Sequence, residues 1–246
     1  MADILAIAAH PDDVELNVAG TLLKSLAAGR SIAICDLTAG ERGSRGSADL
    51  RRAECDAANA VLGVDASTRW NLGIPDGDIA VSKENILAVV RAIRHFRPAV
   101  LLFPGERDRH PDHEHAHRLV REAYFDAGLR HVHTEHDGVA QAPHRPERIY
   151  TFIQRYEREP DFIIDISEHF ERKLDAIGAY ASQFTIPGRE RQVREGEPET
   201  FISSPEFMEY YIARMRQWGF LVGGRYGEGF NTVSGPVKVE GLMETV

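Results

Sequence analysis

Residues 4–13 read Ile4-Leu5-Ala6-Ile7-Ala8-Ala9-His10-Pro11-Asp12-Asp13, a short apolar run that passes at once into a charged turn. An uninterrupted apolar run of this length is typical of a strand that is covered on both faces of a parallel sheet. A helical pattern follows from about Val14 to Ala28, and Gly29 suits the left-handed residue that often ends a helix. A strand that leads through a turn into a helix is the first unit of an α/β fold.

Short apolar runs and longer helical patterns alternate along the rest of the chain. We therefore expect a Rossmann-like α/β fold, a doubly wound and mostly parallel sheet with helices on both faces. The expected strands are Ile4–Ala9, Ser31–Leu37, Thr68–Leu72, Val100–Phe103, Ile149–Ile153 and Phe162–Ile166. The expected helices are Val14–Ala28, Asp49–Leu62, Lys83–Phe96, His113–Ala127, Glu168–Tyr180 and Glu206–Phe220.

Three segments lack a clear period. Leu129–Pro146 and Thr185–Ser204 are rich in His, Pro, Arg and Glu, and we interpret them as loops near a site or an interface. The tail after Gly223 is rich in glycine and has weak strand character at Thr232–Val239. We interpret none of these segments as a linker between domains.

Length and composition predict one domain over residues 1–246, because 43% hydrophobic residues suffice for one sizeable core. The net charge of -9 and the sequence pI of about 5.7 give no basic field, so we expect neither nucleic acid nor membrane as a partner. Cys35 and Cys55 form no C-x-x-C motif, and a reducing cytoplasm fits them best. The run Ile4–Ala9 is too short for a membrane span and lacks the flanks of a signal peptide.

Two loops that contain histidine and aspartate carry the candidate chemistry. His10-Pro11-Asp12-Asp13 follows the first expected strand, and Arg109-His110-Pro111-Asp112-His113 follows the fourth. In the common doubly wound order these two strands are neighbours at the point where the strand order reverses. Both loops then face one crevice at the carboxyl ends of the strands. We therefore expect the two loops to meet in space.

Two imidazoles and one carboxylate from such a meeting form the three-ligand set of a catalytic zinc site, with the fourth position left to water. The predicted ligands are His10, Asp13 and His113. The same ligand types occur in non-haem ferrous sites, so Fe²⁺ is an alternative to Zn²⁺.

The remaining residues of the two loops have the groups that amide hydrolysis needs. Asp12 lies beside the metal without binding it, where it can accept a proton from the attacking water as a general base. His110, protonated and held by the carboxylate of Asp112, can stabilise the oxyanion or protonate the leaving amine.

Simpler interpretations exist for each loop. Asp12 and Glu15 resemble a helix capping box, and Asp112 can serve as the N-cap of the following helix. The segment His113–His117 also satisfies H-E-x-x-H, the helical zinc motif of metalloproteases. That alternative leaves the first loop without a role, and no further motif of the metalloprotease type follows it.

Both loops resemble the signatures of the PIG-L/LmbE-like deacetylases, a His-Pro-Asp-Asp loop after the first strand and a His-Pro-Asp-His loop further on. The likeness covers nearly the whole chain and is greatest to the bacillithiol branch, the N-acetylglucosaminyl-malate deacetylases. The segments that carry it are Cys35-Asp36-Leu37-Thr38, Asp108-Arg109-His110-Pro111-Asp112-His113, Ala179-Tyr180-Ala181-Ser182-Gln183-Phe184 and Gly227-Glu228-Gly229-Phe230.

The resemblance implies a zinc-dependent hydrolase that removes the N-acetyl group from a small N-acetylglucosaminyl conjugate, most closely N-acetyl-alpha-D-glucosaminyl L-malate. It implies the ligands and catalytic residues named above, and a homo-oligomer, commonly a hexamer. The substrate contacts that it implies are Arg51, Arg109 and Gln183.

The sequence departs from the family pattern at an oxyanion residue and in a loop that bears on the substrate. Close relatives have a tyrosine that assists at the oxyanion, and Phe207 aligns with it, while Tyr210 and Tyr211 are expected to pack. The loop Gly40–Ser47 contains more arginine and glycine than this branch leads us to expect. Inositol-linked conjugates and chito-oligosaccharides are therefore alternative substrates.

Other classes of function remain to be distinguished. A non-catalytic metal-binding module would retain the loops only as parts of the fold. A metallophosphoesterase would need a second set of ligands that we do not find, and a dinucleotide enzyme would need a G-x-G-x-x-G turn after the first strand. The histidines His131, His133 and His136 are interpreted as part of a polar loop rather than as a second metal site.

Overall fold

A seven-stranded sheet lies at the centre of the computed structural model, which describes residues 1–156, 158–188, 196–233 and 235. The pairings between neighbouring strands are parallel except those of β9, which is antiparallel to both of its neighbours. In spatial order the strands are β3 (Arg69–Asn71), β2 (Ile32–Asp36), β1 (Ile4–Ala8), β4 (Val100–Pro104), β7 (Arg148–Phe152), β9 (Gly227–Thr232) and β8 (Phe162–Asp165).

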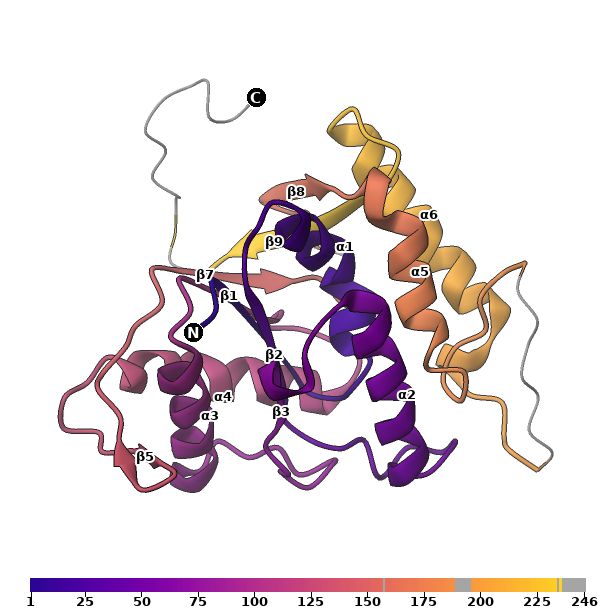
Figure 1. The fold of residues 1–246 in the computed structure, drawn as a ribbon. Coiled ribbons are helices and arrows are strands. Elements are labelled where there is room, and N and C mark those ends of the chain that lie inside the picture. Colours follow the sequence, from indigo (N-terminus) through magenta and orange to yellow (C-terminus); the bar gives the residue numbers. More distant parts are fainter. Residues whose placement is uncertain (157, 189–195, 234, 236–246) are drawn as a thin grey trace.

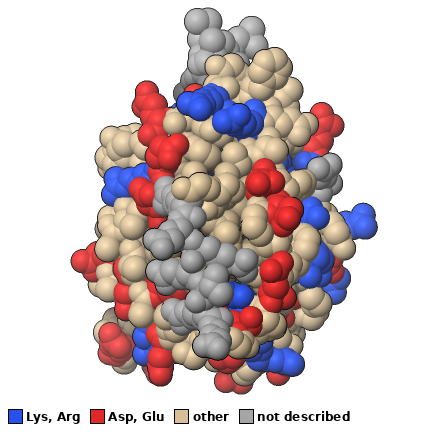
Figure 2. Space-filling model, turned by 90° about the vertical axis from the view of Figure 1, so that its right-hand side faces the viewer, with Lys and Arg blue, Asp and Glu red and all other residues tan. Residues whose placement is uncertain are grey.

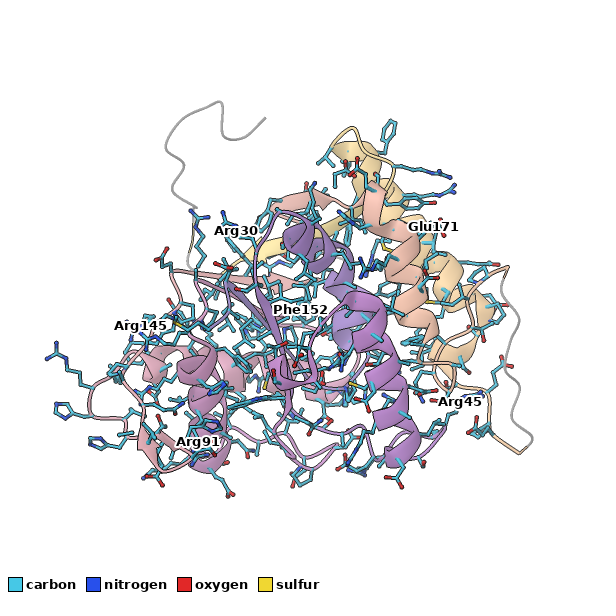
Figure 3. The ribbon with its side chains drawn as sticks, in the orientation of Figure 1. Arg30, Arg45, Arg91, Arg145, Phe152 and Glu171 are labelled. Atoms are coloured by element: carbon cyan, nitrogen blue, oxygen red, sulfur yellow. The ribbon has the colours of Figure 1, made fainter. Side chains whose placement is uncertain are left out.

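Helices cover both faces of this sheet (Figure 1). One layer consists of α3 (Lys83–Phe96) and α4 (Pro111–Ala127). The opposite layer consists of α1 (Asp13–Ala27), α2 (Ala48–Leu62), α5 (Phe170–Gly178) and α6 (Pro205–Leu221). Side chains of β1 alternate between the layers, since Leu5 and Ile7 join the α3 and α4 side while Ala6 and Ala8 join the α1 side. Phe152 at the end of β7 is fully buried between these elements (Figure 3).

The strand order confirms the predicted α/β class and the neighbouring positions of β1 and β4. These two strands pair in parallel, with Ile4 opposite Val100 and Ala6 opposite Leu102. Strand β2 lies on the other side of β1, so the order reverses between β1 and β4. The loops after β1 and β4 therefore leave the same edge of the sheet side by side.

The structure corrects the sequence prediction at the C-terminal end. The expected weak strand at Thr232–Val239 is instead β9, which ends at Thr232, and residues 234 and 236–239 lie outside the described part of the chain. Helix α6 packs directly on β9, so that a Cβ on Gly227 would lie 2.9 Å from the backbone nitrogen of Gly219. The glycines that permit this close approach also interrupt the apolar pattern by which a strand is recognised in a sequence.

A second correction concerns Leu129–Pro146, which we expected to be a loop. It contains a small antiparallel hairpin of β5 (Glu135–His136) and β6 (Val139–Ala140). Asp137 and Gly138 connect the two strands, and both have a positive φ, as a tight hairpin turn requires. Strands of two residues are too short to give a period in the sequence.

The described residues include no helix that is long and apolar enough to cross a membrane. Figure 2 shows acidic and basic side chains interspersed over the side of the molecule that it presents.

A fully buried ion pair ties β9 to α1 and α5. Lys173 Nζ lies 2.5 Å from Glu228 Oε1, and the Glu228 carboxylate also accepts the backbone N–H groups of Gly20 and Thr21. Burial lowers the pKa of Lys173, although the charge of Glu228 opposes that shift. One carboxylate thus binds an ammonium and two backbone donors from two other elements.

We predict that Lys173→Met lowers the free energy of unfolding by about 3–5 kcal/mol, because it leaves the Glu228 carboxylate buried without its counter-charge. Urea unfolding of the purified protein measures this change. Lys83→Met is the matched control, since Lys83 is exposed and its loss should cost less than about 0.5 kcal/mol. Equal losses in the two variants would contradict the role of the pair.

Candidate metal centre

The two histidine-aspartate loops meet at the carboxyl ends of β1 and β4. Ligand atoms of His10, Asp13 and His113 all lie within 4.8 Å of one another. His113 Nε2 is 3.2 Å from Asp13 Oδ1, and His10 Nδ1 is 3.4 Å from Asp13 Oδ2. The structure therefore brings the predicted ligand set together as a candidate His/Asp metal site.

Each imidazole lies near a different carboxylate oxygen of Asp13, His113 near Oδ1 and His10 near Oδ2. Two imidazoles and a carboxylate are suitable donors for Zn²⁺.

Neighbouring carboxylates hold both imidazoles in the orientation that faces Asp13. His10 Nε2 lies 3.1 Å from Asp76 Oδ1, and His113 Nδ1 lies 2.8 Å from Asp108 Oδ1. In the neutral imidazole, each carboxylate can accept the outer ring N–H, which leaves the inner nitrogen available to a metal ion. Burial lowers the pKa of His113, but the carboxylates of Asp13 and Asp108 outweigh it and raise that pKa to about 9.

Asp76 and Asp108 were not predicted from the sequence as site residues. Asp108 lies two residues before His110, and Asp76 lies in the turn that follows β3 at the same edge of the sheet. Their positions next to the carboxyl ends of strands are a signal that could have identified them.

The carboxylate of Asp112 has hydrogen-bond partners other than His110, its predicted partner. Asp112 Oδ2 lies 3.3 Å from His10 Nε2 and accepts the backbone N–H of Gly77 at 2.8 Å. His110 is the N-cap residue of α4, and its Nδ1 accepts the backbone N–H of Asp112 at 3.3 Å. Burial, together with the charges of His10 and His113, lowers the pKa of His110. The geometry thus favours a neutral His110 with its proton on Nε2.

Asp12 occupies the N-cap position of α1, but its carboxylate does not cap the helix. Its side chain makes no capping hydrogen bond, and its φ of 119° is a conformation that residues other than glycine rarely adopt. Asp12 Oδ2 instead accepts a hydrogen bond from Arg51 Nη1 at 2.9 Å. Burial raises the pKa of Asp12 to about 7, against the effect of the Arg51 guanidinium.

Arg51 lines the cavity, but its Nη1 is occupied by Asp12 and by the carbonyl oxygen of Pro11, each at 2.9 Å. The loop after β2 packs against this guanidinium. A Cβ on Gly40, which has a φ of 67°, would lie 3.2 Å from Arg51 Nη1. The glycine content of Gly40–Ser47 therefore allows the backbone to approach Arg51 closely.

The proposed ligands lie on the wall of a cavity of about 510 Å³. Arg109 and Gln183, the other predicted substrate contacts, also line it. Gln183 Nε2 donates to the carbonyl oxygen of Arg45 at 3.2 Å and to Ser182 Oγ at 2.8 Å, so this amide supports the cavity wall. Arg45, labelled in Figure 3, in turn donates to the carbonyl oxygen of Ser182 at 2.6 Å.

Aromatic residues from α6 complete the wall. Phe207 and Tyr211 both line the cavity, whereas Tyr210 is not among its lining residues. The Tyr211 hydroxyl donates to Asn17 Oδ1 or to the carbonyl oxygen of Gln154. The expectation that Tyr211 only packs is therefore incomplete, because its hydroxyl also ties α6 to the loop after β7.

The alternative metal sites are not formed among the described residues. His117 Nδ1 lies 2.9 Å from the carbonyl oxygen of Pro104, and no candidate ligand group includes it. The ring of His136 packs against those of Trp70 and His95, with ring centroids 4.9 and 4.6 Å away, and His136 belongs to no such group either. The other candidate group, His10, His110 and Asp112, shares a histidine with the first.

Comparison with known proteins supports the family resemblance that the two histidine-aspartate loops indicated. Residues 5–124 match the family model of PIG-L, described as GlcNAc-PI de-N-acetylase. The diacetylchitobiose deacetylase of Thermococcus kodakarensis is 30% identical over an alignment that covers 94% of this chain and 83% of that protein. The chain belongs to the PIG-L family.

Solved structures support the same assignment. The conserved protein TT1542 from Thermus thermophilus is 37% identical, with a TM-score of 0.83 and 98% of each chain covered. The 4-carboxy-2-hydroxymuconate hydratase GalB from Pseudomonas putida KT2440 is 23% identical, with a TM-score of 0.73 and coverage of 98% of this chain and 100% of that one. The second likeness is one of fold alone, so the fold of the PIG-L family does not by itself decide the reaction.

We predict that His113→Ala abolishes stoichiometric binding of zinc, because it removes one of three ligands. His117→Ala, one helical turn further along α4, should retain zinc. Metal analysis after dialysis of both purified variants measures the difference. Loss of zinc from both variants would support the H-E-x-x-H alternative instead, because that motif binds zinc through both histidines.

Proposed function

We propose that this member of the PIG-L family is a zinc-dependent deacetylase that hydrolyses the N-acetyl group of an N-acetylglucosaminyl conjugate. The observation that carries the proposal is the convergence of His10, Asp13 and His113 on the wall of one cavity, with Asp12 and His110 beside them. The description of the family and the deacetylase from Thermococcus kodakarensis support it. A homo-oligomer and a cytoplasmic location stay predictions from the sequence.

The proposed ligands would hold an ion that polarises the acetamide carbonyl and acidifies water, as zinc does in hydrolases. Asp12 accepts a proton from the water that attacks this carbonyl, and Arg51 keeps the carboxylate in place. His110 Nε2–H donates a hydrogen bond to the oxygen that becomes negative. When the C–N bond breaks, Asp12 returns the proton to the leaving nitrogen, and the products are acetate and a free amine.

Two arginines that line the cavity favour a substrate that carries an acidic group. Arg109 and Arg155 both lie over the ring of Phe201, with Cζ 4.9 and 5.1 Å from its centroid. Neither guanidinium forms an ion pair with any residue that the structure describes. The other lining arginines are engaged with the protein: Arg42, Arg45 and Arg51.

We therefore propose N-acetyl-alpha-D-glucosaminyl L-malate, of the bacillithiol pathway, as the substrate. Its malate carries two carboxylates, which match the planar donors of two arginines. Conjugates linked to inositol and chito-oligosaccharides are the alternatives, and they offer no carboxylate to this pair.

For catalysis, we predict that Asp12→Asn lowers kcat for amine release from N-acetylglucosaminyl malate by roughly 10²–10⁴-fold, because it removes the proton acceptor and keeps the shape. The assay compares the two proteins at equal zinc content. Turnover at the wild-type rate in zinc-loaded Asp12→Asn would rule out the general-base role.

For specificity, we predict that Arg109→Met combined with Arg155→Met raises KM for the malate conjugate by about 10-fold or more, the size expected for lost charge-assisted hydrogen bonds. The KM for the neutral inositol conjugate should change little. Steady-state kinetics on both substrates measure the contrast. An equal rise for both substrates would argue against an anion-binding role for this pair.

A further inference from the structure

Gln154 places an amide beside the proposed metal ligands, although it lies outside the segment that matches the family model. It follows the end of β7, and only 6% of its surface is exposed. Gln154 Nε2 donates to Asp13 Oδ1 at 3.0 Å and lies 3.4 Å from His113 Nε2. The amide therefore contacts two of the three proposed ligands.

The other end of the amide indicates which contact fixes its orientation. Gln154 Oε1 is buried and has no hydrogen-bond partner among the described residues. The contacts that orient the amide are therefore those of Nε2, and the shorter of them is the hydrogen bond to Asp13 Oδ1.

The backbone of Gln154 is held firmly by α6. Its carbonyl oxygen lies 3.1 Å from the Tyr211 hydroxyl and also accepts a hydrogen bond from Arg214 Nη1. Arg214 Nη2 donates to the neighbouring carbonyl oxygen of Ile153 at 3.2 Å. The amide thus projects from a fixed point of the backbone.

We propose that Gln154 is a positioning residue that orients Asp13 for the metal ion, an inference that rests on the proposed metal site. The backbone N–H of His10 donates to Asp13 Oδ2 at 2.9 Å, and Gln154 Nε2 donates to Asp13 Oδ1. Two donors on two oxygens fix the plane of the carboxylate, whereas one donor would leave it free to rotate. Partners of this kind tune the affinity of a site for its metal.

The test compares zinc binding by Gln154→Leu and Gln154→Met with that of the wild type, by competition with a chromophoric chelator. Both variants fill space but have no N–H, and we expect the Kd for Zn²⁺ to rise by roughly 10–100-fold. The visible absorption spectrum of the cobalt-substituted protein should also change, because it reports the geometry of the ligands. If Gln154→Leu does not fold, the same measurements are made on Gln154→Met.

Gln183→Leu is the matched control. Gln183 is equally buried, at 5% exposed, and lines the same cavity, but its amide binds Arg45 and Ser182 rather than a proposed ligand. Its Kd for Zn²⁺ and its cobalt spectrum should equal those of the wild type.

A wild-type Kd and cobalt spectrum in folded Gln154→Leu or Gln154→Met would overturn the inference, as would an equal loss of affinity in Gln183→Leu. If the wild type itself binds no zinc, the proposed function fails instead. The two failures are therefore distinguishable.

Discussion

The parallel pairing of β1 with β4 is the constraint on which the site depends. Far apart in the sequence, the two strands lie side by side at the point where the strand order reverses, and their loops leave the same edge. His10 and Asp13 come from one loop and His113 from the other. A shift in this pairing would separate the three candidate ligands, because no single loop carries all of them.

Around these ligands the structure concentrates negative charge in a buried place. Aspartates that line the cavity or contact His10 are Asp12, Asp13, Asp76, Asp108 and Asp112. Within the described part of the chain, Arg51 is the one arginine that forms an ion pair with any of them, through Asp12, and the remaining carboxylates contact imidazoles. Buried carboxylates are costly unless opposite charge compensates them, and a dication at the candidate ligands would supply that compensation.

The sequence predicted those features that a local pattern encodes. Apolar runs placed most strands of the sheet, and the spacing of two motifs after β1 and β4 identified His10, Asp13 and His113 as neighbours. Glycines required by close packing concealed β9. The contact between Asp112 and His10 was missed because it depends on a turn that is distant in the sequence. The backbone N–H of Gly77 in that turn binds the Asp112 carboxylate, which lies beside His10. Gln154 gave no signal, since its contact with Asp13 spans 141 positions.

The fold leaves the reaction open, because a hydratase shares it, and the proposed function depends on the candidate metal site. Anomalous diffraction at the zinc absorption edge, from crystals grown with zinc, tests that site most directly. The account predicts one strong peak about 2.0–2.1 Å from His10 Nδ1, a carboxylate oxygen of Asp13 and His113 Nε2. A peak bound by other residues, or none at these three ligands, would contradict it.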